Sequence, residues 1–584
     1  MPHDPTKSFV PYATVAEFAR QQPTPEALVD LCAGFGWAPA FLKLSELACK
    51  LSSAPGAELS EEVRRVTSRL LARYRFAPDA LLRVIGEYFE EHPERPIAQE
   101  PSIYLVQALM LLHGNESEDA PDEYGIPLLL LIANTFVDQW RDPDPTALSE
   151  LEQAVADAFR ASRYVERGSR IPTLIRTWML YQMPFREPMS ADERDRIEQA
   201  AFDGPFEQYF ESFVFPLYLH AASWGLNNLG AYNQVVNPAR WLADANVDEA
   251  WIARQFEKIS VTRADAAEQI RRGIGVDGLP HSPTVFYRYP FIRIEETGSL
   301  IPASARVVQD HLITGLWARF NAGLREVRGR GHMGWFTIFG DMFEGWCRQV
   351  ARNSFAETDQ AHLDLLLSDG IGDDDEIEDV VIAEREANRV VLFSAKARLV
   401  PEATVRGARS RTAALEWLEN FLFVEPTDEH RGGAIRLLNN KIQQIRAGQV
   451  EEIASNSTIF PVLVTYDNIG ETPLLYRWLS QRCTEEGLLQ QDGVASLVVM
   501  AIDDYEFFFS LMTNNLNPIE ILAERNETFE GRMTPVRQAI IETAGEQAVT
   551  RPTWLDQAFN DLAGEGLRRL YNRAVGGGVA EGAD

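Results

Sequence analysis

The chain has 584 residues, too many for one hydrophobic core, so two or three domains are expected. Its composition, 45% hydrophobic and 24% charged, is that of an ordinary globular protein, and its net charge is −31. A protein that coats long duplex DNA normally carries the opposite charge, because its cations neutralise phosphates. The acidity therefore counts against broad nucleic-acid binding. It does not exclude a local site, since salt screens exposed charges beyond about 8 Å.

The cysteines and the apolar runs indicate the compartment. The four cysteines are scattered and include no CxxC pair, which argues against a zinc ribbon or a disulfide framework and favours a reducing cytoplasm. Residues 1–19 lack the basic-then-apolar order of a signal peptide. The longest apolar run, residues 126–137, is shorter than the roughly 20 residues of a bilayer span. We expect a buried core helix there, a cytoplasmic protein and no membrane partner.

Residues 1–284 are predicted to form an all-helical N-terminal region. Apolar residues recur at steps of three and four, for example in residues 63–74, 81–89 and 252–259, as they do in amphipathic helices. A GxGxxG match at residues 273–278 follows a predicted helix and no strand, so we interpret it as a link and not as a dinucleotide site. The region offers no catalytic pattern, and a sensing role for it stays open.

Residues 285–330 are predicted to connect the two halves. Residues 285–294 are rich in aromatic and β-branched side chains and precede the turn signal Thr297-Gly298-Ser299, which favours a β-hairpin or an extended arm. A helix is expected over residues 305–322. Arg288 and Arg293 alternate with aromatic residues and could hold nucleic acid. We prefer a hairpin packed between domains.

From residue 331 onward, short strands alternate with helices. This order predicts a mixed-sheet α/β domain over residues 331–545, followed by a C-terminal helix and a disordered tail in residues 546–584. The expected strands are residues 377–383, 389–397, 459–466 and 496–502, and the expected helices are residues 336–353, 433–449, 473–482 and 554–574.

One strand pair carries residues suited to chemistry. Residues 379–396 are predicted to form two adjacent strands joined by a polar turn. The two-residue period places Ser394 and Lys396 on one face of the second strand, while Asp379 lies early in the first. A carboxylate and a lysine on neighbouring strands suit metal-assisted phosphodiester hydrolysis, because the acid holds Mg²⁺ and the lysine orients the attacking water.

This pattern resembles the core of the PD-(D/E)xK superfamily of restriction-endonuclease-like proteins. That family pairs an Asp with a later (D/E)-x-K on the next strand, often aided by a Glu on the preceding helix, and Glu344 stands at the matching place. The resemblance covers roughly residues 285–545 and implies a restriction-endonuclease-like fold. It also implies catalytic roles for Lys396, Asp379 and Glu344, and Mg²⁺ or Mn²⁺ bound by Glu344, Asp379 and the carbonyl of Ala395.

The motif departs from the family at Ser394, which stands where an acid is expected. A serine hydroxyl is a neutral, weak ligand. Loss of an outer partner of a metal ligand already costs about 10–100-fold in affinity or activity, so the loss of a direct ligand should cost at least as much. Two interpretations stay open. Glu344, Glu378 or Glu384 replaces the missing carboxylate in a divergent nuclease, or the site is inactive and the fold is a scaffold or sensor.

Four arginines follow the lysine and form a local basic patch. They could bind phosphates beside the site, or pair with nearby acids in a solvated loop. The resemblance implies a prokaryotic protein acting on DNA or RNA, in phage defence or nucleic-acid processing. The rival class is a non-enzymatic protein that binds the protein partners of a multi-component system. The arginines are Arg398, Arg406, Arg409 and Arg411.

Overall fold

The structure is a computed structural model, and it describes fifteen stretches of the chain. These are residues 23–53, 100–118, 125–137, 148–161, 171–183, 189–224, 235–238, 248–275, 277–280, 284–329, 335–358, 360–367, 379–397, 411–425 and 432–576. Two of the predicted amphipathic stripes, residues 63–74 and 81–89, lie outside them.

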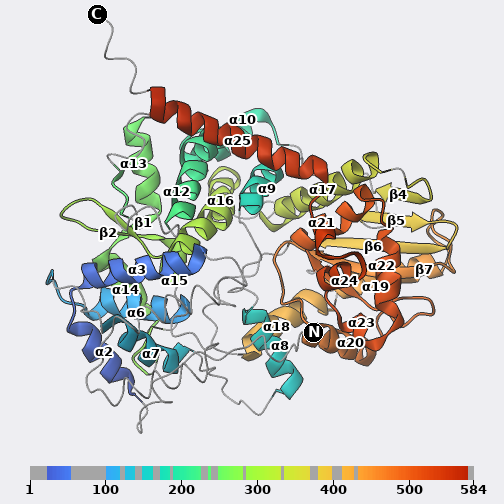
Figure 1. Ribbon diagram of the computed structural model, residues 1–584, viewed down its shortest axis with the longest axis horizontal. Helices are drawn as coiled ribbons and strands as arrows, with labels where there is room; N and C mark the ends of the chain where they lie inside the picture. The colour runs from blue at the N-terminus through green and yellow to red at the C-terminus, as the bar shows by residue number, and fades with distance from the viewer. Residues whose placement is uncertain are drawn as a thin grey trace, which may run out of the picture.

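A five-stranded mixed sheet forms the centre of the C-terminal half and lies at the opposite end of the molecule from the first helices (Figure 1). Its strands follow one another across the sheet in chain order: β4 (Leu363–Leu367), β5 (Val380–Glu384), β6 (Arg389–Lys396), β7 (Thr458–Thr465) and β8 (Val498–Ala501). The first three are antiparallel to their neighbours, and β7 and β8 continue from β6 in parallel. The predicted α/β order of strands and helices is confirmed. The prediction omitted β4, whose apolar run has no alternation to distinguish strand from helix.

Helices cover both faces of this sheet because its strands are apolar on both sides. Val391 and Phe393 of β6 pack with α17 (Trp335–Ala356) and α21 (Ile502–Thr513). The alternate residues Val390 and Leu392 pack on the other face. That face is covered by α18 (Arg411–Leu422), α19 (Ala434–Arg446) and α20 (Pro473–Glu485).

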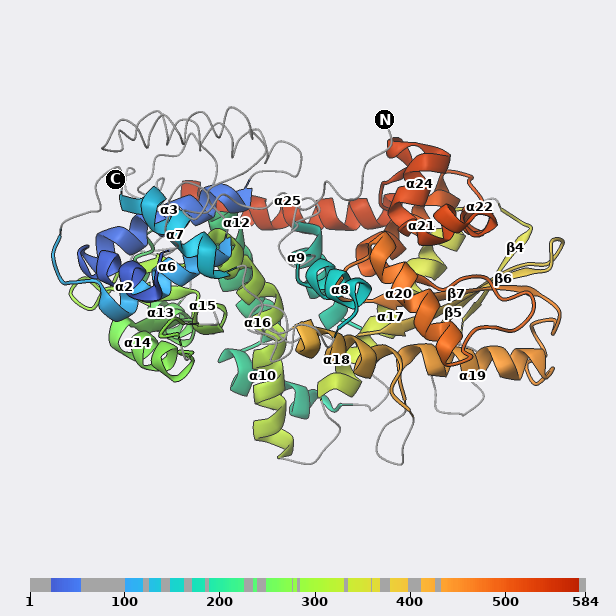
Figure 2. The same cartoon turned by 90° about the horizontal axis from the view of Figure 1, so that it is seen from below.

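The C-terminal helices extend the sheet unit and then leave it. After α21 come α22 (Pro518–Glu527), α23 (Phe529–Met533), α24 (Val536–Ala544) and the short turn Glu546–Ala548. The last helix, α25 (Thr553–Gly576), runs from the sheet unit to the N-terminal helices, as both views show (Figures 1 and 2). The predicted C-terminal helix is therefore confirmed, and it bridges the two halves.

The N-terminal half is mostly helical, as predicted, but it also holds a small sheet. Strand β1 (Ser260–Thr262) pairs in parallel with β2 (Phe291–Arg293), which pairs antiparallel with β3 (Leu300–Pro302). The all-helical prediction for residues 1–284 is thus wrong at β1. The helices are α2 (Pro25–Ala33), α3 (Trp37–Ser53), α6 (Glu100–His113), α7 (Gly125–Val137), α8 (Glu150–Ala161), α9 (Ile171–Tyr181), α10 (Ala191–Phe202), α11 (Phe206–Tyr209), a π turn (Phe210–Val214), α12 (Phe215–Ser223), α13 (Glu249–Lys258) and α14 (Arg263–Arg272).

The predicted hairpin is confirmed, but the residues before it are helical. Strands β2 and β3 form a hairpin around Gly298, whose φ is +67°. Residues 284–288, however, form a helix, α15 (Thr284–Arg288). Their aromatic side chains are buried against α6, so their apolar character reflects burial and not strand formation. The hairpin is packed as preferred: Phe291 is buried, and Arg293 donates a hydrogen bond of 2.8 Å to Ser260.

Two helices of the N-terminal half pack on the C-terminal unit. Val155 and Phe159 of α8 belong to the apolar core beneath β6, and Phe159 stacks on Trp417 of α18 at 5.5 Å between ring centroids. The following helix, α9, packs against α17 and α25. The long connecting helix, α16 (Ala305–Arg328), extends six residues beyond the predicted end at residue 322. None of the described helices has the length and apolarity that a membrane span requires.

A buried cluster of charges joins three distant segments. Arg176 of α9 donates to both carboxylate oxygens of Glu506 in α21, at 2.7 and 2.8 Å, and to Asp503. Arg551, just before α25, donates to Glu506 at 3.1 Å and to Asp503 at 3.2 Å. The side chains of Arg176 and Glu506 are 2% and 0% exposed. Burial raises the pKa of Asp503, but the charges of both arginines hold it below its usual range.

We expect Arg176→Ala to lower the free energy of unfolding by about 3–5 kcal/mol, because it leaves a buried carboxylate without its main cation. The measurement is urea denaturation of the full chain. The exposed pair Arg272–Glu268 provides the control, and Arg272→Ala should change stability by less than about 1 kcal/mol. Equal losses in the two variants would contradict a special role for the cluster.

We also expect His311 of α16 to make stability pH-dependent. Burial, helped by the charge of Arg319, lowers its pKa to about 3. Its Nδ1 lies 2.9 Å from the carbonyl of Tyr287, and its buried Nε2 has no partner among the described residues. Since the unfolded chain binds a proton near pH 6.5 and the folded chain does not, stability falls as pH drops through the window from 6.5 towards 3.

The expected loss is up to about 2 kcal/mol between pH 6.5 and 5. His311→Asn, which keeps a donor towards the carbonyl, should remove that part of the slope. Urea denaturation at several pH values measures it, and His362→Asn at an exposed position is the control. Identical pH slopes for His311→Asn and the wild type would refute this assignment.

Candidate functional site

The site predicted from the sequence lies where β5 begins beside the end of β6. The last ladder pair of these strands is Val380 with Phe393, so Asp379 falls opposite Ser394. The buried carboxylate of Asp379 accepts a hydrogen bond of 2.7 Å from the N–H of Ala395. The side chain thus replaces a backbone acceptor at the end of the ladder. One carboxylate oxygen, Oδ1, is left for a second donor or a cation.

The Ala395 carbonyl faces the same side. In a strand, the N–H and C=O of one residue point to the same neighbour. Because the N–H of Ala395 points to Asp379, its C=O points towards the β5 side as well. The carbonyl proposed as a metal ligand therefore lies at this end of the β5–β6 pair.

Ser394 is enclosed. Its side chain is 0% exposed, and its hydroxyl oxygen has no hydrogen-bond partner among the described residues. By strand alternation it shares a face with Val390 and Leu392, which pack against α18 and α19. Lys396 has the same parity and is half-buried at the last position of β6. A carboxylate at position 394 would be costly to bury without a cation.

Glu344 approaches from the other face of the sheet. Its helix, α17, packs on the side of β6 that carries Phe393 and Ala395. Burial raises the pKa of the Cys347 thiol, and the charges of Asp379 and Glu344 raise it further. By the β5–β6 register, Asp379 has the same strand parity as Ser394 and Lys396, and Glu344 is on the helix that covers the other face.

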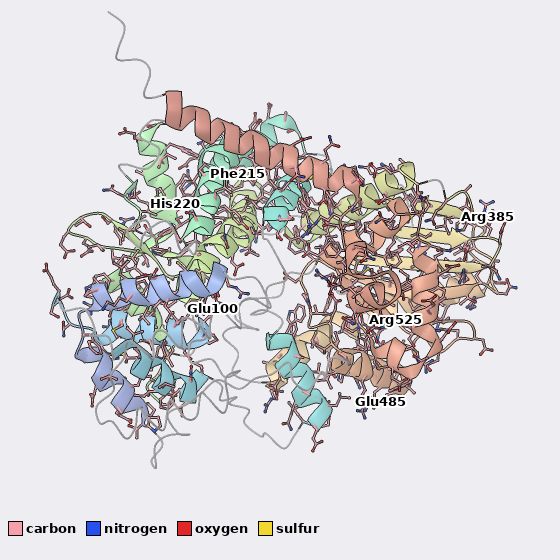
Figure 3. The ribbon with its side chains drawn as sticks, in the orientation of Figure 1. Glu100, Phe215, His220, Arg385, Glu485 and Arg525 are labelled. Carbon is pink, nitrogen blue, oxygen red and sulfur yellow. The ribbon has the colours of Figure 1, made fainter. Side chains whose placement is uncertain are left out.

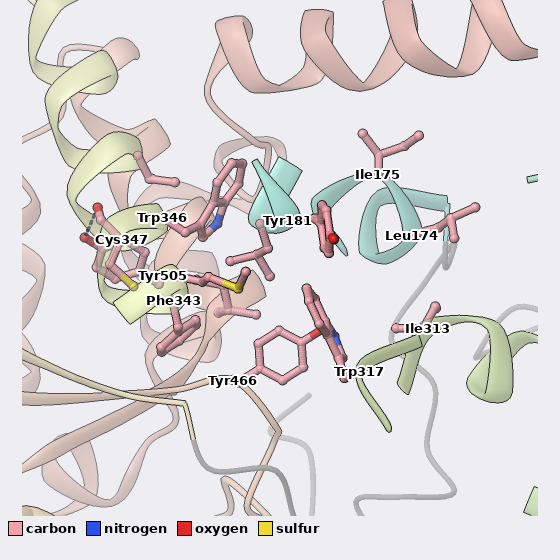
Figure 4. Packing of buried hydrophobic residues seen from close by; sticks show 14 of the residues in the cluster. Leu174, Ile175, Tyr181, Ile313, Trp317, Phe343, Trp346, Cys347, Tyr466 and Tyr505 are labelled. Carbon is pink, nitrogen blue, oxygen red and sulfur yellow. Dashed lines mark hydrogen bonds between the residues drawn. The ribbon is translucent and has the colours of Figure 1, made fainter. Parts of the chain in front are cut away.

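Two residues that the sequence prediction did not single out for the site fix α17 in place. The Tyr505 hydroxyl donates to the backbone carbonyl of Cys347 at 2.9 Å (Figure 4). The indole of Trp346 donates to Glu506 at 3.3 Å, which connects α17 to the buried charge cluster. Neither contact has a local sequence signal, since about 160 residues separate the partners.

Glu384, one of the acids predicted to replace the missing carboxylate, lies at the far end of β5. At about 3.3 Å per residue, the five residues from Asp379 to Glu384 span about 16 Å. Its carboxylate is also occupied, because it pairs with Arg389 at 2.5 Å and accepts from Asn517 at 2.9 Å. The next residue, Arg385, marks this outer edge of the molecule (Figure 3). The proposal that Glu384 takes over is therefore wrong, and Glu378 lies outside the described residues.

The basic patch is described at one residue only. Arg411 begins α18 and forms a two-pronged ion pair with Asp157 of α8, with both distances 3.1 Å. This is the structural alternative foreseen for the patch, a pairing with nearby acids. Arg398, Arg406 and Arg409 lie outside the described residues.

Within the described stretches, no three His, Cys, Asp or Glu side chains come close enough together to hold a metal ion. At the start of β5 the Asp379 carboxylate lies beside the backbone of Ala395, and Glu344 is on the helix that packs on this strand pair. Oxygen donors of this kind suit Mg²⁺ or Mn²⁺. Ser394 would add only a weak neutral ligand.

Comparison of the chain with known protein families, with curated proteins and with solved structures gave no match. The resemblance to the PD-(D/E)xK superfamily thus rests on the residue pattern alone.

We expect Ser394→Ala to leave stability within about 1 kcal/mol of the wild type, or to raise it, because it removes a buried polar group that makes no described hydrogen bond. The matched control is Ser457→Ala. Ser457 is equally buried, but its hydroxyl donates to Asn388 at 2.7 Å, and its loss should cost about 1–3 kcal/mol. Urea denaturation compares the two. A loss above about 2 kcal/mol for Ser394→Ala would reveal a partner for the hydroxyl.

Proposed function

We propose that the C-terminal half is a PD-(D/E)xK nuclease-like domain that acts on DNA or RNA with Mg²⁺ or Mn²⁺. The role suggested by the resemblance is prokaryotic phage defence or nucleic-acid processing. In this proposal Asp379, Glu344 and the Ala395 carbonyl bind the ion, and Lys396 positions the attacking water. Cleavage is weak, since Ser394 supplies no charge where the family has an acid.

The observation that carries this proposal is the bond from the Ala395 N–H to the Asp379 carboxylate. It holds the acid directly beside the Ser-Ala-Lys strand, in the register that the resemblance requires. The position of α17 adds support, because this helix, which carries Glu344, precedes the strands and packs on both of them. A metal ion there would be a Lewis acid for a phosphate oxygen and would lower the pKa of a bound water.

A second candidate function is a catalytically inactive scaffold or sensor that binds protein or nucleic-acid partners. Two observations favour it. Ser394 is completely buried, and the placement of Glu384 removes one of the acids that could compensate. The net charge of −31 also disfavours extended nucleic-acid binding.

The test restores the missing charge. We expect the wild type to cut plasmid DNA or RNA slowly in Mn²⁺, and Asp379→Ala and Lys396→Ala to abolish cutting. Ser394→Glu should raise the rate by about tenfold or more, since it supplies a direct ligand. Ser394→Gln, which has the same size but no charge, is the control. The shorter Ser394→Asp serves if Glu does not fit.

A metal readout accompanies the activity measurement. A buried carboxylate at position 394 needs a cation, so Mn²⁺ should raise the melting temperature of Ser394→Glu more than that of Ser394→Gln. If the wild type does not cut and Ser394→Glu gains neither cutting nor stabilisation by Mn²⁺, the scaffold function is the correct one.

A further inference from the structure

We propose that Arg348 is a phosphate-binding residue of this site and holds a phosphodiester group of the nucleic-acid strand. The sequence pattern did not single it out, and the family resemblance was not carried to it. The inference rests on the proposed function and deepens it by naming the group that contacts the substrate backbone.

The guanidinium of Arg348 has a donor that the described part of the chain leaves unsatisfied. Arg348 is half-buried on α17, and its Nη1 is shielded from solvent with no hydrogen-bond partner among the described residues. An arginine cannot release its proton, so this donor stays charged. A buried donor without an acceptor costs about 1–3 kcal/mol, and more when the group is charged. A phosphate oxygen would satisfy it, and the guanidinium fork matches the geometry of phosphate.

Arg348 lies four residues after Glu344, so the two side chains lie on the same side of α17, one turn apart. Burial raises the pKa of Tyr505, with Cys347 and Asp379 adding to the rise, and the positive charge of Arg348 opposes it. The same charge opposes the rise at Cys347. The charges of Arg348 and Asp379 thus influence the same two side chains, which supports the position given by the helical spacing from Glu344.

Three other arginines have carboxylate partners. The guanidinium of Arg411 is bonded to Asp157, and those of Arg176 and Arg551 are bonded to Glu506 and Asp503. Arg352, one turn beyond Arg348 on the same helix, is exposed to solvent. Arg348 thus combines a shielded, unsatisfied donor with a position one helical turn from Glu344. A cation there would offset the repulsion between that acid and an incoming phosphate.

The experiment measures binding without cleavage. Fluorescence anisotropy of the full-length chain with labelled DNA and RNA oligonucleotides, single-stranded and duplex, is recorded in EDTA between about 50 and 200 mM salt. We expect Arg348→Gln to weaken binding about tenfold and to reduce the slope against salt by about one, as loss of a single phosphate contact should. The matched control, Arg352→Gln, should stay within about twofold of the wild type. Comparing the affinity for DNA with the affinity for RNA shows which nucleic acid supplies the phosphodiester group.

Three results would overturn the inference: no binding of any oligonucleotide by the wild type, wild-type affinity in Arg348→Gln, or equal losses in Arg348→Gln and Arg352→Gln. If Arg348→Gln does not fold, Arg348→Lys decides, because it keeps the charge and loses the fork. Weaker binding with an unchanged salt slope is then expected, and wild-type affinity refutes the inference. Failure here is distinct from failure of the proposed function. If binding depends on Arg348 but the protein does not cut in Mn²⁺, only the nuclease function is refuted. If the protein cuts but binding does not depend on Arg348, only this inference is refuted.

Discussion

The ion cluster of Arg176, Arg551, Glu506 and Asp503 is the interaction on which the arrangement of the chain depends. Its arginines come from α9 and from the residues just before α25, and its acids come from α21 on the sheet. Buried charges of this kind are tolerated only when they are paired and hydrogen-bonded. Three segments must therefore meet before any of them is satisfied, and 330 residues separate Arg176 from its partner Glu506.

This constraint reaches the candidate site through two hydrogen bonds. Trp346 is bonded to Glu506, and the neighbouring carbonyl of Cys347 is bonded to Tyr505, so α17 cannot rotate on the sheet without breaking contacts at both. Glu344 and Arg348 lie on either side of this pair along the helix. Their placement relative to Asp379 is thus set by a polar core, and the large apolar cluster around Phe343 and Phe393 fills the remaining space.

The sequence predicted what is determined locally. The alternation of β6 and the breaks around it located both strands of the Asp379–Lys396 pair to within a few residues, since period-two patterning acts over a single strand. The long amphipathic stripe of α17 also predicted that helix from the sequence. The hydrophobic pattern did not predict the correct element where buried helices and strands use the same apolar residues, as at Phe286 in α15 and at β4.

The sequence does not indicate which faces of the helices and strands pack against one another. Nothing local indicates that Glu344 and Ser394 lie on opposite sides of the strand layer, or that Glu384 is held by Asn517 at the far edge. The pairing of Arg176 with Glu506 is likewise invisible to a residue pattern. Such facts depend on contacts between remote segments, and they decide whether three chemically suitable residues form a site.

The position of Arg551 has a consequence for how the molecule can be divided. A fragment cut at residues 331–545, the boundaries predicted from the order of strands and helices, would retain Glu506 and Asp503 but lose both of their cations. It would also uncover the apolar surface of α18 that α8 covers. Anyone isolating the sheet half would need to retain residues 148–181 and continue past residue 551. The smallest autonomous part of this protein is therefore discontinuous along the chain.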